Sequence, residues 1–457
     1  MRLDGLLVRC LAFAVVGVLC ADETTEETKD FTPSIISTGE ASVPTGPYIS
    51  YQTTSTLDDD INDNHPDATS TTTGSLLPTG TPGNASMSVV STNSDSMTVL
   101  EGGHHTTTLV NGTATSSSTP TPSSSPVVNT QPCNGYVEFC DRAYSNITNI
   151  VAHNSPFVRP GNIASNQALD LEDQLSDGIR TIQFQTHLIN GTLYLCHTNC
   201  DLLNVGTLED YLARVNRWMR RNPYEVITIF MGNFDLVNPA NFTGPIERSG
   251  LMDLVWTPPK VPMGLDDWPT LASMILSNKR AIFTLDYGTN QTAFPWLMDQ
   301  FSQVWETPFS PTHEDFPCTV QRPPGLPPKE IANRMYMANH NLNLRVDLGL
   351  TDAEILVPNM AYLVDTNGVS GYGSLGSMAE NCTGKWGRPP NFLLVDYYNY
   401  GKPNGSVFEV AAQMNNVTYK GNCCGKSSDA TTSVPQGLGL GSLMLVGGFA
   451  HLLTLVF

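Results

Sequence analysis

Short apolar runs recur along the chain from about residue 133 and predict β-strands. One run, residues 179–189, is unusual because Gln183, Gln185 and His187 take every second place among apolar residues. Successive side chains of a strand point to opposite faces, so these three polar side chains share one face. The predicted strands cover residues 147–153, 179–189, 193–197, 225–234, 281–288, 334–343 and 391–401.

Amphipathic stretches between these runs predict helices at residues 207–223, 269–278 and 406–415. Thr207 begins the first of them, and acidic residues in the next turn suit the positive end of a helix. Apolar strands that alternate with amphipathic helices predict an α/β fold, in which helices cover a parallel sheet. A barrel fits the length of this region.

Polar residues that suit chemistry lie late in several predicted strands. In a barrel, the C-terminal ends of the strands form the active site. The residues placed there by the predicted strands are His153, His197, Asn233, Asp286, His340 and Asp396.

The N-terminal part of the chain has the composition of a targeted, extended segment. Residues 1–21 indicate a secretory signal peptide, because Arg2 and Arg9 precede an apolar run and small residues follow it. Residues 22–131 are rich in Ser, Thr and Pro, with too few large apolar side chains to offset chain entropy. We expect a disordered stalk there, either O-glycosylated or a plain linker.

The C-terminal residues have the order of a GPI-anchor signal. Residues 423–436 hold a small-residue cluster and a polar spacer, and residues 437–457 are apolar. Ser427 or Ser428 is the expected attachment site. The alternative is a single membrane-spanning helix, but glycines in the tail and the lack of a basic stop favour the anchor.

Cysteines and glycosylation signals agree with secretion into an oxidising compartment. Eight cysteines follow the signal peptide, and the short separations favour the local bridges Cys133–Cys140 and Cys196–Cys200. The N-x-S/T acceptor sites are Asn84, Asn111, Asn146, Asn190, Asn241, Asn290, Asn381, Asn404 and Asn416.

The net charge of −20 narrows the class of partner. Residues 22–131 contain 13 acidic residues and one lysine, and the chain shows no basic patch. These features exclude nucleic acid as a partner. We expect a monomer on the extracellular face of the plasma membrane or in the cell wall, GPI-anchored or secreted, that meets the membrane through its C-terminal anchor.

Two histidines and a carboxylate at strand ends are the groups that phosphodiester cleavage needs. One imidazole accepts a proton from the attacking hydroxyl, and the other donates one to the leaving oxygen. His153 and His197 suit these roles, and Asp396 would fix the tautomer of one ring. We expect the rings to face each other across ~5–9 Å, with Asp396 in hydrogen-bond reach of His153.

The ordered motifs AHNS, GIRTIQFQ, LYLCHT, VITIFMGN, AIFTLD and NFLLVDYYNYG resemble the catalytic X-type domain of phosphatidylinositol-specific phospholipase C. The resemblance covers residues 132–422 and implies an irregular TIM (β/α)8-type barrel. It also implies that His153 and His197 are the catalytic acid–base pair and that Asp396 steadies the first histidine. A lipid or headgroup phosphodiester is the implied substrate.

Three positions depart from this family. Its metal-independent members carry an aspartate after the first histidine and Asp-x-Arg on the second strand, where this chain has Asn154, Gln183 and Gln185. Its calcium-dependent members have carboxylates in place of the two glutamines. A hard dication prefers charged oxygen ligands, so we expect no metal or other cofactor. Calcium is the metal ion that the resemblance to the calcium-dependent members implies, but its ligand carboxylates are missing.

Neutral side chains and one arginine must then bind the phosphate. Arg159 is the candidate because it follows His153 closely, whereas Arg180 has the opposite parity to the glutamines and should point away. His187 as a zinc ligand is the alternative, but no H-x-H spacing supports it. The predicted substrate-binding residues are Asn154, Gln183, Gln185, His187, Arg159 and His340.

Two hypotheses of different classes remain open. The first is a phosphoric diester hydrolase of phospholipase C type, which the histidine pair favours. The second is a catalytically weak or inactive barrel that binds phospho-headgroups as a surface glycoprotein, which the lost charges favour. A glycerophosphodiesterase would need a His-Arg pair and metal carboxylates, and the sequence shows neither.

Overall fold

The computed structural model describes residues 34–36, 46–51, 53–57, 129–347, 354–421 and 423–424. The signal peptide, most of residues 22–131 and the C-terminal signal lie outside these residues. The predicted anchor sites Ser427 and Ser428 and the acceptors Asn84 and Asn111 lie outside them too.

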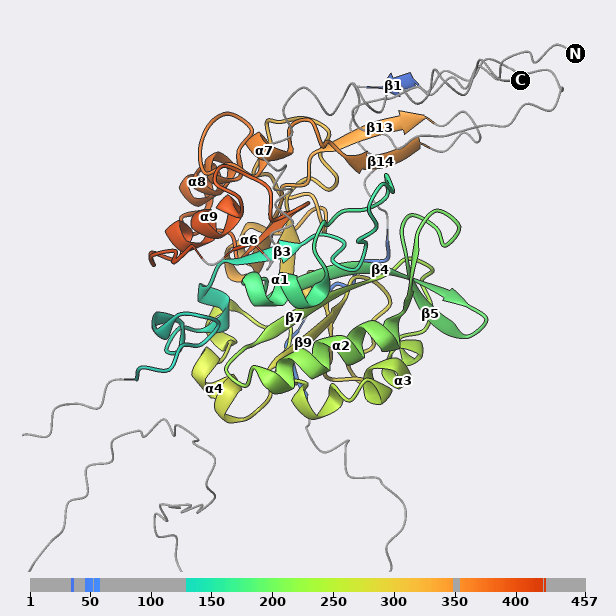
Figure 1. The fold of residues 1–457 in the computed structure, drawn as a ribbon. Coiled ribbons are helices and arrows are strands. Elements are labelled where there is room, and N and C mark those ends of the chain that lie inside the picture. The colour runs from blue at the N-terminus through green and yellow to red at the C-terminus, as the bar shows by residue number, and fades with distance from the viewer. Residues whose placement is uncertain are drawn as a thin grey trace, which may run out of the picture.

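A curled sheet of eight parallel strands forms the centre of the protein (Figure 1). The strands follow the chain around the curve, and the last, β15, pairs in parallel with the first, β3. Within the described sheet no ladder joins β10 to β11, so the barrel is open along this side. The α/β barrel prediction is confirmed, with this irregularity. The strands are β3 (Asn149–Ala152), β4 (Thr181–Ile189), β7 (Ile227–Asn233), β9 (Ala281–Leu285), β10 (Leu297–Asp299), β11 (Val304–Glu306), β12 (Met335–Asn339) and β15 (Phe392–Val395).

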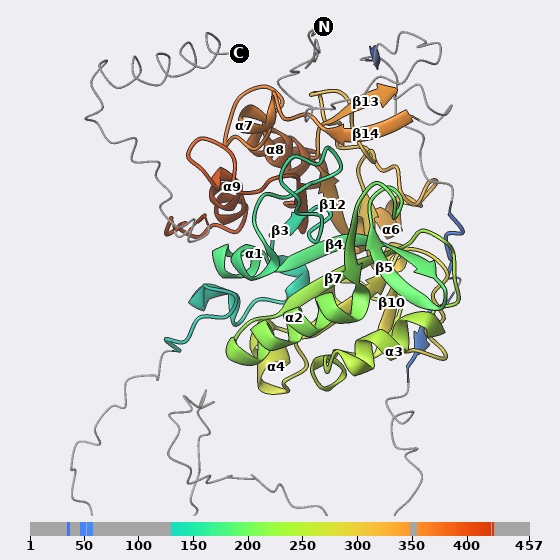
Figure 2. The ribbon, with the colours of Figure 1, turned by 45° about the vertical axis from the view of Figure 1, so that its right-hand side comes forward.

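Helices cover the outside of this sheet (Figure 2). The predicted helix after Thr207 is α2, and the Thr207 hydroxyl accepts a hydrogen bond from the Asp210 amide at its first turn. The α-helices are α1 (Leu171–Asp177), α2 (Leu208–Arg221), α3 (Ala240–Arg248), α4 (Leu271–Leu276), α5 (Gln300–Gln303), α6 (Pro328–Asn333), α7 (Leu363–Thr366), α8 (Leu375–Trp386) and α9 (Ser406–Met414). Short 3-10 turns cover Val137–Phe139, Tyr144–Asn146, Met252–Leu254 and Leu265–Asp267.

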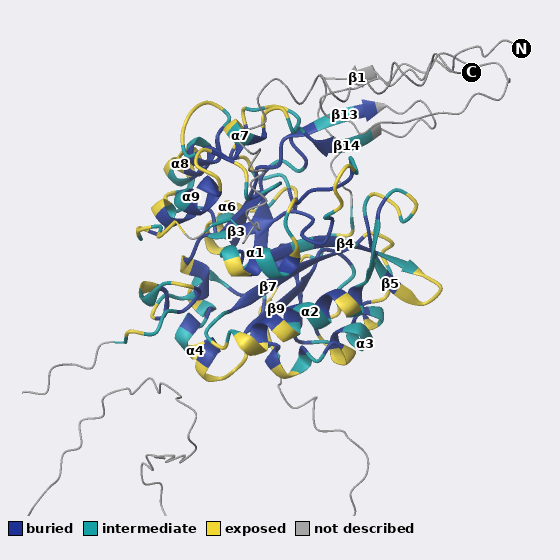
Figure 3. Cartoon of the chain, viewed as in Figure 1, coloured by how far each residue is buried: buried dark blue, intermediate teal, exposed yellow. Residues whose placement is uncertain are grey.

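The alternation within β4 separates the core from the polar face, as predicted. Ile182 and Phe184 are fully buried, and the Phe184 ring meets the Tyr211 ring of α2 at 5.4 Å. Gln183, Gln185 and His187 are only partly buried on the opposite face. Buried residues fill the sheet while exposed residues lie mainly on the outer helices and loops (Figure 3), so the core lies between sheet and helices.

A hairpin carries the chain back from β4 to the site. Asn190 and Gly191 form its turn with positive φ angles of 50° and 79°, which Asn and Gly adopt readily. β5 (Thr192–Cys196) returns antiparallel to β4 and then pairs with β6 (Asn204–Thr207), which leads into α2. His197 therefore follows directly on β5, at the same end of the barrel as the polar face of β4.

The N-terminal segment departs from the prediction of disorder at residues 46–51 and 53–57, which together we call the strap. The Tyr48 ring packs edge-on against Phe301 of α5 at 4.9 Å and against Tyr287 at 5.6 Å. β2 (Ser55–Thr56) pairs antiparallel with β8 (Lys260–Val261). Two tyrosines, Tyr48 and Tyr51, supply the aromatic area that the surrounding Ser/Thr-rich sequence lacks. The strap contacts α5, which links β10 to β11 at the open side of the barrel.

A second small sheet lies apart from the barrel strands (Figure 2). β1 (Ser34–Ile36) pairs antiparallel with β13 (Asn343–Asp347), which pairs antiparallel with β14 (Glu354–Pro358). β1, like the strap, falls within the Ser/Thr-rich segment of residues 22–131.

Disulfides and surface asparagines agree with a secreted domain. The predicted bridges Cys133–Cys140 and Cys196–Cys200 are present, together with Cys318–Cys382 and Cys423–Cys424. No helix within the described residues is long and apolar enough to cross a bilayer. Among the predicted glycosylation sites, Asn241 is half-buried, and the exposed ones are Asn146, Asn190, Asn290, Asn381, Asn404 and Asn416.

The two disulfide types should differ in their effect on stability. Cys318–Cys382 spans 64 residues and Cys196–Cys200 spans four, and a longer loop loses more entropy in the cross-linked unfolded chain. Replacing both cysteines of the long loop by alanine should lower the free energy of unfolding by about 4 kcal/mol, against about 2 kcal/mol for the short loop. Urea denaturation measures both values, and equal losses would contradict this reading.

Candidate active site

His153 and Asp396 lie together because their strands are neighbours. Ala152 of β3 is in register with Val395 of β15, and each candidate is the next residue along its strand. His153 Nδ1 lies 2.7 Å from Asp396 Oδ1, and both side chains are buried. This contact sets Nδ1 as the protonated nitrogen and leaves Nε2 of His153 as the acceptor.

Neighbouring amides hold this pair in place. The side-chain amide of Asn166 donates to Asp396 Oδ1 at 2.9 Å, and the Gln167 amide donates to the His153 carbonyl oxygen at 2.8 Å. Asn166 also lines the cleft. Neither residue was predicted, because an amide in a loop between a strand and a helix carries no distinctive sequence signal.

His197 presents the same nitrogen from the opposite wall. Its Nδ1 donates to the Ala164 carbonyl oxygen at 2.8 Å, which leaves Nε2 as the acceptor, and its ring stacks on Phe157. Burial lowers the pKa of His197 to about 4, although the bond to Ala164 opposes the shift. His197 is therefore a neutral imidazole near pH 7 before any ligand binds.

Asn154 connects the two imidazoles. Its amide nitrogen lies 3.2 Å from Nε2 of His153 and 3.3 Å from Nε2 of His197, so the two ring nitrogens are at most about two hydrogen-bond lengths apart. The predicted convergence of His153, His197 and Asp396 is present in the geometry. Asn154 Oδ1 is buried without a hydrogen-bond partner among the described residues.

The two glutamines form the floor beside this pair. Gln183 Oε1 accepts a hydrogen bond from the Asn154 backbone amide at 2.9 Å, so it also holds the loop of the first histidine. Gln185 lies over Gly232 of β7, where an added Cβ would come within 2.0 Å of Gln185 Oε1. Glycine at position 232 therefore makes room for the second glutamine.

A cleft with about 1340 Å³ of empty space, its open mouth included, joins these groups. His153, His197, Gln183 and His187 line it. Phe234 and Leu236 line its wall and are more than half exposed. The cleft is therefore polar at its floor and apolar at one lip.

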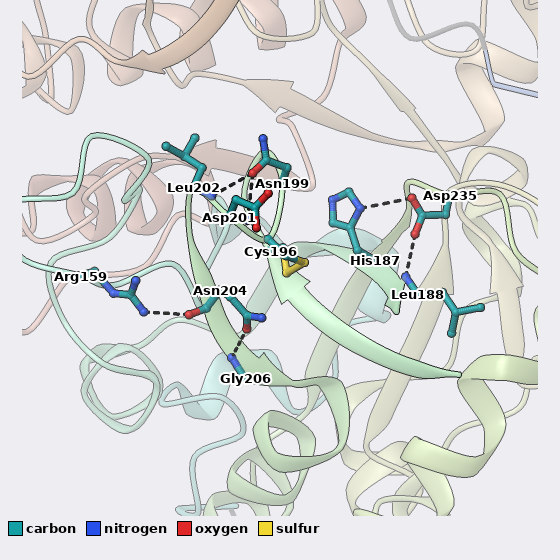
Figure 4. Close-up of a disulfide and its surroundings, with 11 residues drawn as sticks. Arg159, His187, Leu188, Cys196, Asn199, Asp201, Leu202, Asn204, Gly206 and Asp235 are labelled. Carbon is teal, nitrogen blue, oxygen red and sulfur yellow. Dashed lines mark hydrogen bonds and ion pairs between the residues drawn. A yellow bond between two sulfur atoms is a disulfide. The ribbon is translucent and has the colours of Figure 1, made fainter. Parts of the chain in front are cut away.

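Two predicted binding residues lie elsewhere. The Arg159 side chain is exposed and its guanidinium donates to the Asn204 carbonyl oxygen at 2.8 Å (Figure 4), so it is not among the lining residues of the cleft. His340 is fully buried, with Nε2 bound to the Thr366 carbonyl oxygen at 2.9 Å. A strand position alone could not reveal that the His340 ring faces the helices. Arg180 points away as predicted and pairs with Glu225 at 2.7 Å.

Arg322 lines the cleft, although it is not among the site residues predicted from the sequence. Its guanidinium is buried, pairs with Glu306 at 3.0 Å and donates to the Tyr287 hydroxyl at 2.8 Å. Arg322 lies in the long segment between β11 and α6, whose sequence predicts no element that would direct it inward.

Asp286 adds a carboxylate to the cleft. Burial raises its pKa to about 6, against the hydrogen bond that it accepts from the Asn233 backbone amide at 2.7 Å. Near pH 7 the cleft thus contains the negatively charged Asp286 carboxylate and an arginine whose charge is balanced by Glu306, so it attracts an anion only weakly.

The donor set does not suit calcium. The positions that would supply carboxylates hold the neutral side chains Asn154, Gln183 and Gln185, and a hard dication prefers charged oxygens. Throughout the described part of the chain, no group of three or more His, Cys, Asp or Glu side chains is arranged to hold a metal ion. The alternative of a zinc site at His187 therefore has no support from these described side chains.

Residues 139–415 match the family described as PI-PLC X 1. The chain belongs to the PI-PLC X family. Among relatives, an "uncharacterized secreted protein" of Arthroderma benhamiae is 50% identical over 453 residues, covering 96% of each chain. The "PI-PLC X domain-containing protein 1" of the same fungus is 37% identical over 288 residues, covering 62% of this chain and 90% of that protein.

Solved structures similar to this PI-PLC X chain are distant. The phosphatidylinositol-specific phospholipase C of Listeria monocytogenes is 14% identical, with a TM-score of 0.39, covering 61% of this chain and 96% of that chain. A single-residue mutant of the phosphatidylinositol-specific phospholipase C of Staphylococcus aureus is 12% identical, with a TM-score of 0.41, covering 61% of this chain and 95% of that chain.

The neutral state of His197 can be measured directly. We expect the Cε1 proton of His197 to titrate with a midpoint near pH 4 in the ligand-free protein, against about 6.5 after unfolding in urea. Because the unfolded chain binds this proton at higher pH, His197 lowers stability as the pH falls from 6.5 to 4. NMR of the protein with labelled histidine checks this, and a midpoint above 6 would refute it.

Proposed function

We propose that this protein is a phosphoric diester hydrolase of phospholipase C type that acts on a lipid or headgroup phosphodiester. The observation that carries the proposal is that His153 and His197 lie on either side of Asn154, and that Asp396 is hydrogen-bonded to the His153 ring. Two imidazole Nε2 atoms on either side of a space about as wide as a phosphate group, one to accept a proton and one to donate a proton, are what intramolecular attack on phosphorus requires.

His153 is the base in the proposed mechanism. A hydroxyl of the substrate attacks its own phosphorus, and Nε2 of His153 takes the hydroxyl proton while a new O–P bond forms. The Asp396 carboxylate, 2.7 Å from the other ring nitrogen, stabilises the imidazolium that results. The product of this step is a cyclic phosphate.

His197 is the acid. Protonated at Nε2, it donates that proton to the leaving oxygen as the O–P bond to the alcohol, a diacylglycerol in a phospholipid, breaks. Its low pKa in the free protein favours donation, since a stronger acid transfers the proton more readily, but it also keeps the protonated form scarce. An anionic phosphate between the rings favours the protonated form and offsets this scarcity.

A second candidate function is a binder of phospho-headgroups with little or no turnover. The observation that favours it is the electrostatics of the cleft, where Asp286 is a carboxylate and Arg322 is already paired with Glu306. Loss of a charge that stabilises the transition state typically costs ~10²-fold or more in rate.

The proposed location is the extracellular face of the plasma membrane or the cell wall. The four disulfides among the described residues support passage through an oxidising compartment. The proposed partners are the phosphodiester substrate and a membrane reached through the C-terminal GPI anchor, and we propose a monomer without a cofactor.

Turnover by purified protein tests the proposal. We expect release of a cyclic headgroup phosphate from phosphatidylinositol, or of the headgroup alcohol from a lysophospholipid whose free glycerol hydroxyl attacks, with either release unchanged by EDTA. His153→Ala and His197→Ala should each lower kcat/KM by about 10²–10⁴-fold, because each removes a proton-transfer group. His313→Ala, at an exposed histidine outside the cleft, is the matched control.

Two outcomes would overturn this assignment. Activity abolished by EDTA would show that a metal is required. Activity untouched by His153→Ala would remove His153 from the reaction, whereas the absence of turnover in the unchanged protein would favour the binder.

The pH dependence follows from the low pKa of His197. The acid must be protonated in the free enzyme, and its protonated fraction falls as the pH rises above about 4. We therefore expect kcat/KM to be higher at pH 5–6 than at pH 8, with a decline of up to about tenfold per pH unit on the alkaline side. A profile that rises towards pH 8 would contradict the role of His197 as the acid.

A further inference from the structure

The cleft offers few positive charges for a phosphate. Arg322 directs three donors to Glu306, Tyr287 and the strap residue Tyr48, whose hydroxyl lies 3.4 Å from Nε. Its charge is neutralised by the buried Glu306 carboxylate. His197 is neutral because burial lowers its pKa to about 4. Neither group is then free to offer a phosphate oxygen an uncompensated cationic N–H.

His187 differs from both of these groups. Its Nδ1 lies 3.2 Å from Asp235 Oδ1, and Asp235 Oδ2 accepts the Leu188 backbone amide at 2.7 Å (Figure 4). The Leu188 amide holds the Asp235 carboxylate in place, and the carboxylate in turn orients the His187 ring. His187 lines the cleft on its other side.

Nε2 of His187 has no hydrogen-bond partner among the described residues, although it is buried. A buried polar atom without a partner is uncommon and points to a group that is not part of the chain. With Nδ1 turned to Asp235, this nitrogen is the one left towards the cleft. The Phe234 ring, 4.5 Å from the His187 ring, limits where the imidazole can turn.

We propose that His187, oriented by Asp235, is the phosphate-binding cation of this cleft. Protonated His187 donates one N–H to Asp235 and the other to a non-bridging oxygen of a phosphodiester monoanion. It would thereby supply the positive charge that the neutral residues Gln183 and Gln185 do not. The proposal rests on the proposed function for its substrate class and assigns Asp235 as a positioning residue.

Titratable side chains from several elements lie near His187. Asp235 faces it from the loop after β7, and Tyr194 of β5 lies opposite it in the antiparallel register. A positive charge on His187 lowers the pKa of His197, so the two rings interact. An imidazole gains its charge as the pH falls, so we expect phosphate binding to strengthen in that direction.

Binding of dimethyl phosphate tests this without relying on turnover. This diester keeps a single negative charge between pH 5.5 and pH 8 and has no hydroxyl to attack its phosphorus. We expect the full-length protein to bind it more tightly at pH 5.5 than at pH 8, with a change in the His187 ring resonances on NMR titration. A charge-assisted hydrogen bond is worth about 1.5–3 kcal/mol, so His187→Gln should weaken binding about 10–100-fold at pH 5.5.

Three further variants separate charge from structure. His187→Lys should restore binding at pH 8, because it returns a cation. Asp235→Asn keeps a polar side chain but loses the carboxylate that orients the His187 ring, so it should weaken binding. His313→Ala should bind as the unchanged protein does. Unfolding transitions of all variants establish that they are folded.

The outcomes distinguish this proposal from the proposed function. Binding that depends on His187 in a protein without turnover would support the proposal and favour the binder. Turnover with unchanged dimethyl phosphate affinity in folded His187→Gln would overturn the proposal and leave the hydrolase intact. Ligand-induced shifts confined to His153 and His197 would overturn it as well.

Discussion

The site depends on the parallel ladder between the first and last strands of the barrel. Residues 153 and 396 are far apart in sequence, yet the register of Ala152 with Val395 makes their successors neighbours. The hydrogen bond between His153 and Asp396 exists only if the sheet curls far enough for β15 to meet β3. Slippage of this ladder by one residue would turn the Asp396 side chain to the opposite face of the sheet. The fold and the proposed proton transfer are thus coupled through one strand pair.

Much of this organisation could be predicted from local patterns. Period-two alternation in β4 identified a polar face, and strand ends identified His153, His197 and Asp396, because these signals depend only on neighbours in sequence. The inward path of Arg322 and the burial of His340 depend on loops and packing, which no local pattern encodes. Arg159 was placed near the phosphate by sequence distance, but the chain turns and directs its side chain to Asn204.

The N-terminal strap illustrates the same limit. The composition of residues 22–131 as a whole predicts disorder, but a composition averaged over the segment does not reveal the two tyrosines, Tyr48 and Tyr51. Tyr48 becomes ordered because Phe301 and Tyr287 provide aromatic partners, and Phe301 lies in α5, which links β10 to β11. A segment outside the family match thus packs against the helix at the side of the barrel where the ladder is interrupted.

The docking of this strap changes how the Ser/Thr-rich sequence relates to the barrel. On one side of the Ser/Thr-rich stretch, the Leu57 backbone amide donates a hydrogen bond to the Pro259 carbonyl oxygen, and on the other side the Asn134 backbone amide donates one to the Tyr224 carbonyl oxygen. The intervening stretch is therefore tethered at both ends, so its length cannot set how far the cleft stands from a lipid surface. In the proposed GPI-anchored form, attached near Ser427, the residues beyond Cys424 would join the barrel to the membrane, and the Ser/Thr-rich stretch would not.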